Sequence, residues 1–407
     1  MSKGHHINEI HIAKIKGTYG RIVGARSNTK PYGLYQYEWL VQVKTDGGLV
    51  GVTNAAPAIR TGSSLEQLQI RLNNLIGRDI FEFYKINSGR ITGVNPRWDE
   101  FLKLNGFLSY AIFDLIAQAH GVPAYKLLGE KVREQVDVYD TTMNFQDMVH
   151  PEVGVEAVAR DVKGAISKGY RAVKLTVGRG LQALESNAGL TRDIEVVMRT
   201  REVAGPDVRI MVDANDAYSQ MTDRTANVAQ MLENFVRETA GANLFWLEEM
   251  ITQDLDGYRM LKQWRDKYAP ETLLADGESS DGRSTIYWEM MEEGLLDVFQ
   301  PDMLRMGFWP YHQLALDIGD SGYDIRIAPH NNGHGGLGLR GLIQFGAATP
   351  MVLIGEDPTY NFDVYNTPEY KFDNGAYSVS ESPGLGIEIN QDVYAQKYSS
   401  KEVVLRA

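Results

Sequence analysis

The 407-residue sequence contains no cysteine, which excludes disulfide bonds and thiolate chemistry. It also has no run of about 18 apolar residues, the length that a helix needs to cross a bilayer. Basic residues form no cluster and the net charge is −12, which argues against nucleic acid as a partner. The opening MSKGHHINEI lacks the apolar core of a signal peptide. From these absences we expect a soluble cytoplasmic protein that binds neither membrane nor nucleic acid.

The first 130 or so residues have the pattern of a mixed α+β unit. The segments NEIHIAKIKG and YEWLVQVKTDGGLVG alternate as antiparallel strands do, and DGG suits a hairpin turn. A helix is predicted in SSLEQLQIRLNNLIG, where Ser64 and Gln67 form a capping box and Gly77 follows its end. The segment GFLSYAIFDLIAQAHG predicts a buried helix. We therefore place an α+β domain at residues 1–133.

From about residue 135, short apolar runs recur with starts 25 to 38 residues apart, separated by helical stretches. This spacing is typical of βαβ units with parallel strands. Eight such units predict a (β/α)₈ barrel at residues 134–371. An open doubly wound sheet is the alternative, which the lack of a Gly-rich phosphate loop disfavours. Residues 372–407 alternate again, and we expect this tail to return to the N-terminal domain. The eight runs start at residues 135, 171, 209, 244, 272, 297, 324 and 351.

Polar residues stand where the apolar runs end, and in such a barrel these ends meet at one mouth, where the chemistry takes place. Asp213, Glu248 and Glu278 end three consecutive runs. Three neighbouring carboxylates repel one another unless a cation lies among them, and an oxygen-only ligand set suits Mg²⁺. The alternative is that they are independent helix caps or salt-bridge partners. The other polar strand ends include Lys174, Thr176, Asn215, Asp302, His330 and Glu356.

A general base is available at the same mouth. His330 follows the seventh run, and Asp302 ends the sixth, where it could orient the imidazole and raise its basicity. A purely structural histidine is the alternative. Lys174 either binds an anionic substrate group or pairs with a carboxylate, and Glu356 is either a hydrogen-bond donor kept protonated by its neighbours or a cap. Such a site suits removal of the proton α to a carboxylate, with a cation stabilising the enediolate.

The order of these motifs resembles the enolase superfamily, in its mandelate racemase group, over nearly the whole chain. RAVKLTVG is similar to the strand with the family's Lys-x-Lys pair, and MVDAN, WLEEM and ADGES resemble the three metal-ligand strands. PDMLRMG and IAPH resemble the strands of an aspartate–histidine dyad, and SPGLGIEI the closing segment.

This resemblance implies Asp213, Glu248 and Glu278 as Mg²⁺ ligands and a His330–Asp302 dyad as the base. It implies Glu356 as hydrogen-bond donor to a carboxylate substrate, and Lys174, Thr176 and Asn215 as further residues of the site. The N-terminal domain would cap the barrel, with its loops choosing the substrate. We name Lys30, Tyr32 and Arg60 as candidate substrate-binding residues, each of which could equally be an ordinary surface residue. The family habit also suggests a homo-oligomer.

One departure is informative, because Thr176 stands where the family has its second lysine. Racemisation needs a base on each face of the α-carbon, and threonine cannot serve as one. Asp302 in place of a lysine on strand six argues against cycloisomerases and dipeptide epimerases. What remains is chemistry that one base completes, so we predict Mg²⁺-dependent dehydration of an acid sugar (aldonate, uronate-derived or aldarate) to a 2-keto-3-deoxy acid. The alternatives are a racemase or epimerase, and a catalytically silent metal-binding barrel.

Overall fold

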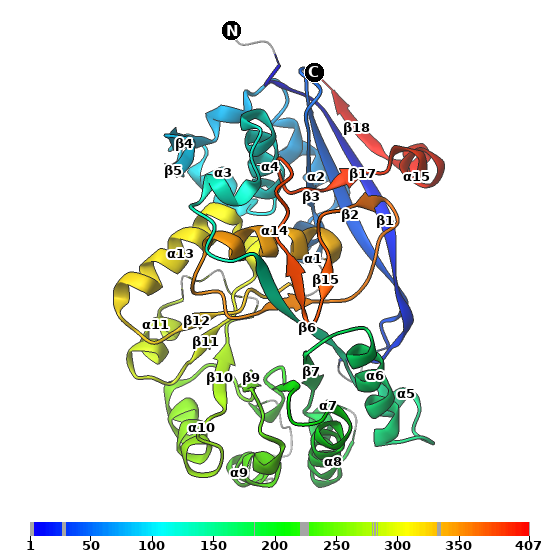
Figure 1. Cartoon of the computed structure of the whole chain (residues 1–407), viewed down its shortest axis with the longest axis vertical. Coiled ribbons are helices and arrows are strands. Elements are labelled where there is room, and N and C mark those ends of the chain that lie inside the picture. Colours follow the sequence, from blue (N-terminus) through cyan, green and yellow to red (C-terminus); the bar gives the residue numbers. More distant parts are fainter. Residues whose placement is uncertain are drawn as a thin grey trace.

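The computed structural model describes residues 4–26, 30–182, 184–219, 228–278, 280, 282, 284–331 and 335–406. A barrel forms the lower part of Figure 1, and a sheet with flanking helices covers it from above, with both marked termini at the top. Among the described residues, no helix has both the length and the apolar character needed to cross a bilayer.

The upper part is an antiparallel sheet in the order β18-β1-β2-β3, with α4 packed against it. Burial alternates along β1, as expected for a strand with one face on a core. Gly51 of β3 is required by close packing, because a Cβ there would lie 2.3 Å from the Ala111 carbonyl oxygen of α4. The predicted capping box of Ser64 and Gln67 is present at the start of α2. The elements are β1 (Ile7–Val23), β2 (Gly33–Thr45), β3 (Val50–Asn54), α1 (Ala56–Arg60), α2 (Leu65–Asn73), β4 (Tyr84–Asn87), β5 (Arg90–Val94), α3 (Asp99–Leu104), α4 (Leu108–His120) and β18 (Val403–Arg406).

The lower part is a ring of eight parallel strands. Neighbours pair in sequence order from β6 to β12, and β13 pairs with β6. Val352, just before β13, bridges to Ile327 of β12 and closes the ring. The predicted (β/α)₈ barrel is therefore confirmed, and the open-sheet alternative is wrong. The strands are β6 (Gln135–Met143), β7 (Ala172–Thr176), β8 (Arg209–Asp213), β9 (Trp246–Glu248), β10 (Leu273–Asp276), β11 (Val298–Phe299), β12 (Arg326–Ile327) and β13 (Gly355–Asp357).

Helices follow the strands and cover the outside of the ring (Figure 1). Most present an apolar stripe to the barrel, whereas α14 is buried on nearly every side and also contacts β3 of the upper sheet. It therefore joins the two parts. The helices are α5 (Gln146–Val149), α6 (Val155–Ser167), α7 (Arg179–Gln182), α8 (Ser186–Ala204), α9 (Val228–Thr239), α10 (Leu255–Tyr268), α11 (Thr285–Glu292), α12 (Met303–Met306), α13 (Phe308–Ser321) and α14 (Gly335–Ala348).

The C-terminal tail contacts both parts. β16 (Ala376–Ser378) pairs antiparallel with β6, and β15 (Phe372–Asp373) pairs antiparallel with β16, so the two strands extend the barrel sheet. Farther along, α15 (Gln391–Lys397) leads to β18, which pairs with β1, so the tail completes the capping sheet as expected. Between these segments, β14 (Tyr365–Asn366) pairs with β17 (Glu388–Ile389). The domain limits at residues 133/134 and 371/372 remain predictions.

Candidate active site

An apolar layer fills the barrel interior. Each of the eight strands, or the residue next to it, contributes one buried side chain to a single cluster, and Tyr139 meets Trp246 edge-on at 5.4 Å between ring centroids. This layer closes the barrel below the mouth. Its members are Tyr139, Ala172, Met211, Trp246, Ala275, Val298, Ala328 and Ile354.

The polar side chains of the site form the next layer toward the C-terminal ends of the strands. Successive side chains of a strand alternate between its two faces, so the residue two positions later again faces the interior. This simple period explains why the polar strand ends converge above the apolar layer. The residues that follow each member of the apolar layer by two positions are Thr141, Lys174, Asp213, Glu248, Gly277, Gln300, His330 and Glu356.

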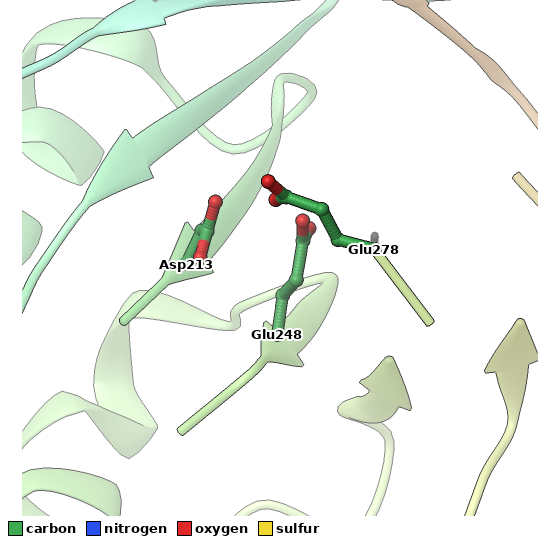
Figure 2. Close-up of side chains that lie close together, drawn as sticks. All are labelled: Asp213, Glu248 and Glu278. Carbon is green, nitrogen blue, oxygen red and sulfur yellow. The ribbon is translucent and has the colours of Figure 1, made fainter. Parts of the chain in front are cut away.

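The carboxylates of Asp213, Glu248 and Glu278 lie together, with one oxygen from each within 4.8 Å of the others. Figure 2 shows them converging from neighbouring strand ends. The second oxygen of Glu248 is fixed, because Trp246 Nε1 donates to Oε2 over 2.8 Å and Gln300 Nε2 over 3.2 Å. Oxygen-only donors in a buried cluster fit a hard divalent cation. Burial raises the pKa of Glu248 to about 7, against the effect of Lys174. A bound cation would stabilise the ionised carboxylate and so offset the effect of burial on this pKa.

Lys174 lies inside this cluster. Its Nζ is 2.5 Å from Glu248 Oε1, 3.1 Å from Asp213 Oδ2 and 3.8 Å from Glu356 Oε1. Burial lowers the pKa of Lys174, but these carboxylates outweigh it and hold the pKa well above its usual value. Of the two interpretations of Lys174, the structure therefore shows pairing with carboxylates, and contact with a substrate anion remains a prediction.

His330 and Asp302 are neighbours at the barrel mouth and contact each other. The Nδ1 atom of His330 bonds to Asp302 Oδ1, and the two residues form a parallel bridge. The other ring nitrogen, Nε2, is buried and has no hydrogen-bond partner in the described part of the chain, although it lies 3.3 Å from Glu278 Oε2 and 3.5 Å from Glu356 Oε2. Burial lowers the pKa of His330, but Glu278, Glu356 and Asp302 outweigh it and raise the pKa to about 10. The imidazole is thus strongly basic and held in one orientation.

The surroundings of Glu356 do not favour the hydrogen-bond donor role that we expected for it. Burial raises its pKa, but His330 and Lys174 outweigh burial and the pKa is lowered. Its Oε2 accepts a 2.5 Å hydrogen bond from the Asn331 amide. In this arrangement Glu356 is an ionised acceptor, so a donor role requires it to take up a proton.

A cavity of about 540 Å³ opens beside His330, within the usual range for small-molecule sites. The candidates Tyr32 and Arg60 line it, together with Glu278 and Asp302. Thr176 lines a narrower crevice next to it and donates to Asn144 Oδ1 over 2.8 Å.

Two other candidates are placed differently. Asn215 donates through Nδ2 to Asp213 Oδ1 over 2.6 Å and lines neither cavity, so it orients a carboxylate. Lys30 is exposed and is also absent from the described lining of both cavities.

Sequence reasoning missed two arginines of the cavity, Arg26 and Arg305. Arg26 Nη2 is 2.8 Å from both oxygens of Glu278. Burial raises the pKa of Glu278, but His330 and Arg26 outweigh it and lower the pKa to about 2. Neither arginine stands at a strand end, so the periodic pattern gave no signal for them. Their positions are set by the loop after β1 and by the short helix α12.

Comparison with known proteins agrees with this architecture. A solved galacturonate dehydratase from Geobacillus sp., complexed with D-galacturonate and 5-keto-4-deoxy-D-galacturonate, is 25% identical with a TM-score of 0.82, covering 99% of this chain and 100% of that one. A mandelate racemase/muconate lactonizing protein from Geobacillus sp. Y412MC10, complexed with magnesium and tartrate, is 25% identical with a TM-score of 0.81, covering 99% and 98%. D-galactarolactone cycloisomerase from Agrobacterium fabrum is 27% identical over 371 residues, 88% of this chain and 90% of that protein.

Fold and site together define a capped (β/α)₈ barrel whose mouth combines a carboxylate cluster with a histidine–aspartate pair. The model of the enolase C-terminal domain-like family matches residues 157–393, and the chain belongs to that family. The resemblance to the enolase superfamily that the motifs indicated is thereby confirmed.

Proposed function

We propose that the protein is an Mg²⁺-dependent acid-sugar dehydratase, which converts its substrate to a 2-keto-3-deoxy acid. The observation that carries this proposal is the imidazole of His330, held at Nδ1 by Asp302, with a buried Nε2 that makes no hydrogen bond among the described residues and lies beside the three-carboxylate cluster. A general base needs a fixed orientation and a ring nitrogen that faces the substrate site, and His330 supplies both. The solved galacturonate dehydratase named above is similar over the whole chain and supports this choice.

The carboxylate cluster would hold the cation, with Asp213, Glu248 and Glu278 as ligands. A bound divalent cation supplies positive charge that stabilises the enediolate formed from the substrate carboxylate. Magnesium is the preferred ion because all three donors are oxygens, and the similar magnesium/tartrate complex supports it. Lys174, within 3.1 Å of two of the ligands, would add a second positive charge at the same place.

His330 would carry out both proton transfers. Glu278 and Glu356 raise the pKa of His330 by stabilising its protonated form, and the positive charge of a bound cation near them would weaken this effect. The pKa of His330 would then fall from about 10, so that the neutral form is populated. Neutral Nε2 then takes the α-proton, and the electron pair of the C–H bond forms the enediolate. That pair expels the β-hydroxyl, which takes the proton from Nε2 and leaves as water. The resulting enol tautomerises to the 2-keto acid.

Cycloisomerisation of an acid-sugar lactone is a second candidate, favoured by the relative named D-galactarolactone cycloisomerase. When the β-oxygen belongs to a lactone ring, the same proton removal and elimination opens the ring in place of releasing water. The sequence argument against cycloisomerases rested on Asp302 standing where a lysine was expected, but this route needs only the His330–Asp302 pair. The two functions differ in the leaving group and not in the base.

The test is to incubate the purified protein and Mg²⁺ with a panel of aldonic, uronic and aldaric acids and their lactones, and to measure 2-keto acid formation. We expect a product that disappears with EDTA and with His330→Asn. His150→Asn is the matched control, since that imidazole is partly exposed beside Glu152 and is absent from the described lining of both cavities. Product from lactones alone would favour cycloisomerisation, and His330-independent product would refute the proposed base.

A further inference from the structure

Three guanidinium groups line the cavity beside His330, although the protein as a whole carries a net charge of −12. They come from separate elements: Arg26 follows β1, Arg60 ends α1 and Arg305 lies in α12. Arg26 belongs to the inner end, because it is paired with Glu278 of the carboxylate cluster. Arg60 and Arg305 are exposed and lie with Gln36 and Thr61 at the wall formed by the capping sheet and α12.

The acidic side chains in the described lining of this cavity, Glu278 and Asp302, both lie at its inner end. Glu278 contacts Arg26 and His330, and Asp302 contacts His330. Among the described lining residues, no other acidic side chain is present. A second cavity of about 350 Å³ shares Arg305 and is lined by Arg71 and Lys103, again with no acidic residue in its described lining. The charged side chains in the described lining of the outer cavity, and of the inner cavity toward Arg60 and Arg305, are therefore all positive.

A substrate of matching charge would have a carboxylate at each end. Its reacting carboxylate would lie at the cluster, and its chain would extend through the 540 Å³ cavity toward the cap. Guanidinium groups bind carboxylates with paired, charge-assisted hydrogen bonds, whereas a terminal hydroxymethyl group offers them no charge. Building on the proposed function, we infer that the substrate is an aldarate, a sugar diacid, and that Arg60 and Arg305 bind its remote carboxylate.

Binding can be tested apart from catalysis. The Mg²⁺-loaded His330→Asn variant is titrated calorimetrically with one matched pair of ligands, an aldarate and the aldonate of the same six-carbon sugar. We expect the aldarate to bind at least about tenfold more tightly, which corresponds to about 1.4 kcal/mol. Adding Arg60→Gln or Arg305→Gln should reduce aldarate affinity about tenfold and change aldonate affinity less than threefold. Arg→Lys at each position should restore part of the preference.

Arg97→Gln is the matched control, because Arg97 is exposed on the cap and lines neither cavity. Equal binding of the two acids, no binding of either, or a preference that survives in the double Arg60→Gln/Arg305→Gln variant would overturn the inference. The proposed function fails differently, when the intact protein forms no 2-keto acid. A protein that turns over aldonates better than aldarates would keep the dehydratase assignment and refute the diacid.

Discussion

At the scale of single residues, the environment of His330 sets both its charge and its direction. Asp302 fixes Nδ1, and this leaves Nε2 as the reactive atom facing Glu278 and Glu356. Glu278, Glu356 and Asp302 together raise the pKa of the imidazole to about 10, against the effect of burial. Removing any one of them weakens the base, and only Asp302 also holds its orientation.

Asp302→Asn therefore has a predicted effect on both rate and pH profile. Without this carboxylate the pKa of His330 falls, so the acidic limb of the kcat/KM profile moves to lower pH. The loss of orientation lowers kcat by at least about 10²-fold. Asp317→Asn, an exposed position on α13, is the control. A profile that stays in place, or moves to higher pH, would contradict the pairing of Asp302 with the catalytic imidazole.

Thr176→Val distinguishes one-base from two-base chemistry. The hydroxyl donates to Asn144 Oδ1 over 2.8 Å, and its loss costs about 1 kcal/mol of stability. Since Thr176 is not a base in this mechanism, kcat should fall less than about tenfold, against about 10³-fold for His330→Asn. Steady-state kinetics of both variants check this. A loss at Thr176 as large as that at His330 would make the threonine part of the proton-transfer chemistry.

At the scale of elements, the barrel strands and their polar ends could be predicted because both follow local periods. Each strand is a short apolar run, and the residue two positions above the apolar layer is inward-facing by alternation alone. This placed Asp213, Glu248 and His330 correctly at one mouth. The pairing of Lys174 with a carboxylate was one of two interpretations that the sequence left open. The partner of Arg26 could not be predicted, since it depends on how the loop after β1 meets the distant end of β10 over the barrel.

The junction between cap and barrel contains a buried carboxyl that sequence patterns did not single out. Glu38 of β2 is fully buried and accepts a 3.2 Å hydrogen bond from Tyr360, in the loop after β13. Its other oxygen has no partner among the described residues. Burial raises the pKa of Glu38 to about 8, against the lowering effects of Tyr360 and Arg60. Glu38 is thus protonated at neutral pH in the folded protein.

Glu38→Gln should stabilise the protein in a pH-dependent way. The folded state keeps the proton up to about pH 8, whereas the unfolded chain releases it above pH 4.5, the ordinary pKa of a glutamate side chain. Wild-type stability from this group is therefore lost as pH rises between these values, by about 5 kcal/mol at most. The amide does not titrate, so the variant gains stability relative to wild type from pH 5 to 8. Denaturant unfolding measures this, with exposed Glu66→Gln as control. A pH-independent difference would refute the raised pKa.

At the scale of the whole molecule, a bound cation should stabilise the fold. Asp213, Glu248 and Glu278 come from separate strands, so the unfolded chain does not present them together. Mg²⁺ at 100 times its Kd would then add about 2.7 kcal/mol to the free energy of unfolding. Thermal unfolding with and without Mg²⁺ measures this shift, which Glu248→Gln should abolish and Glu66→Gln should keep. An equal shift in both variants would place the ion elsewhere.

The most direct test of the central claim, that one histidine removes an α-proton to drive elimination, is proton NMR of substrate and product in D₂O. With Mg²⁺ and a sugar acid from the panel, we expect the 2-keto-3-deoxy acid to accumulate while recovered substrate keeps its configuration at the α-carbon. The 2-keto-3-deoxy acid should not form with His330→Asn. Accumulation of the α-epimer without 2-keto acid would show a second base on the opposite face, and would contradict the single-base account.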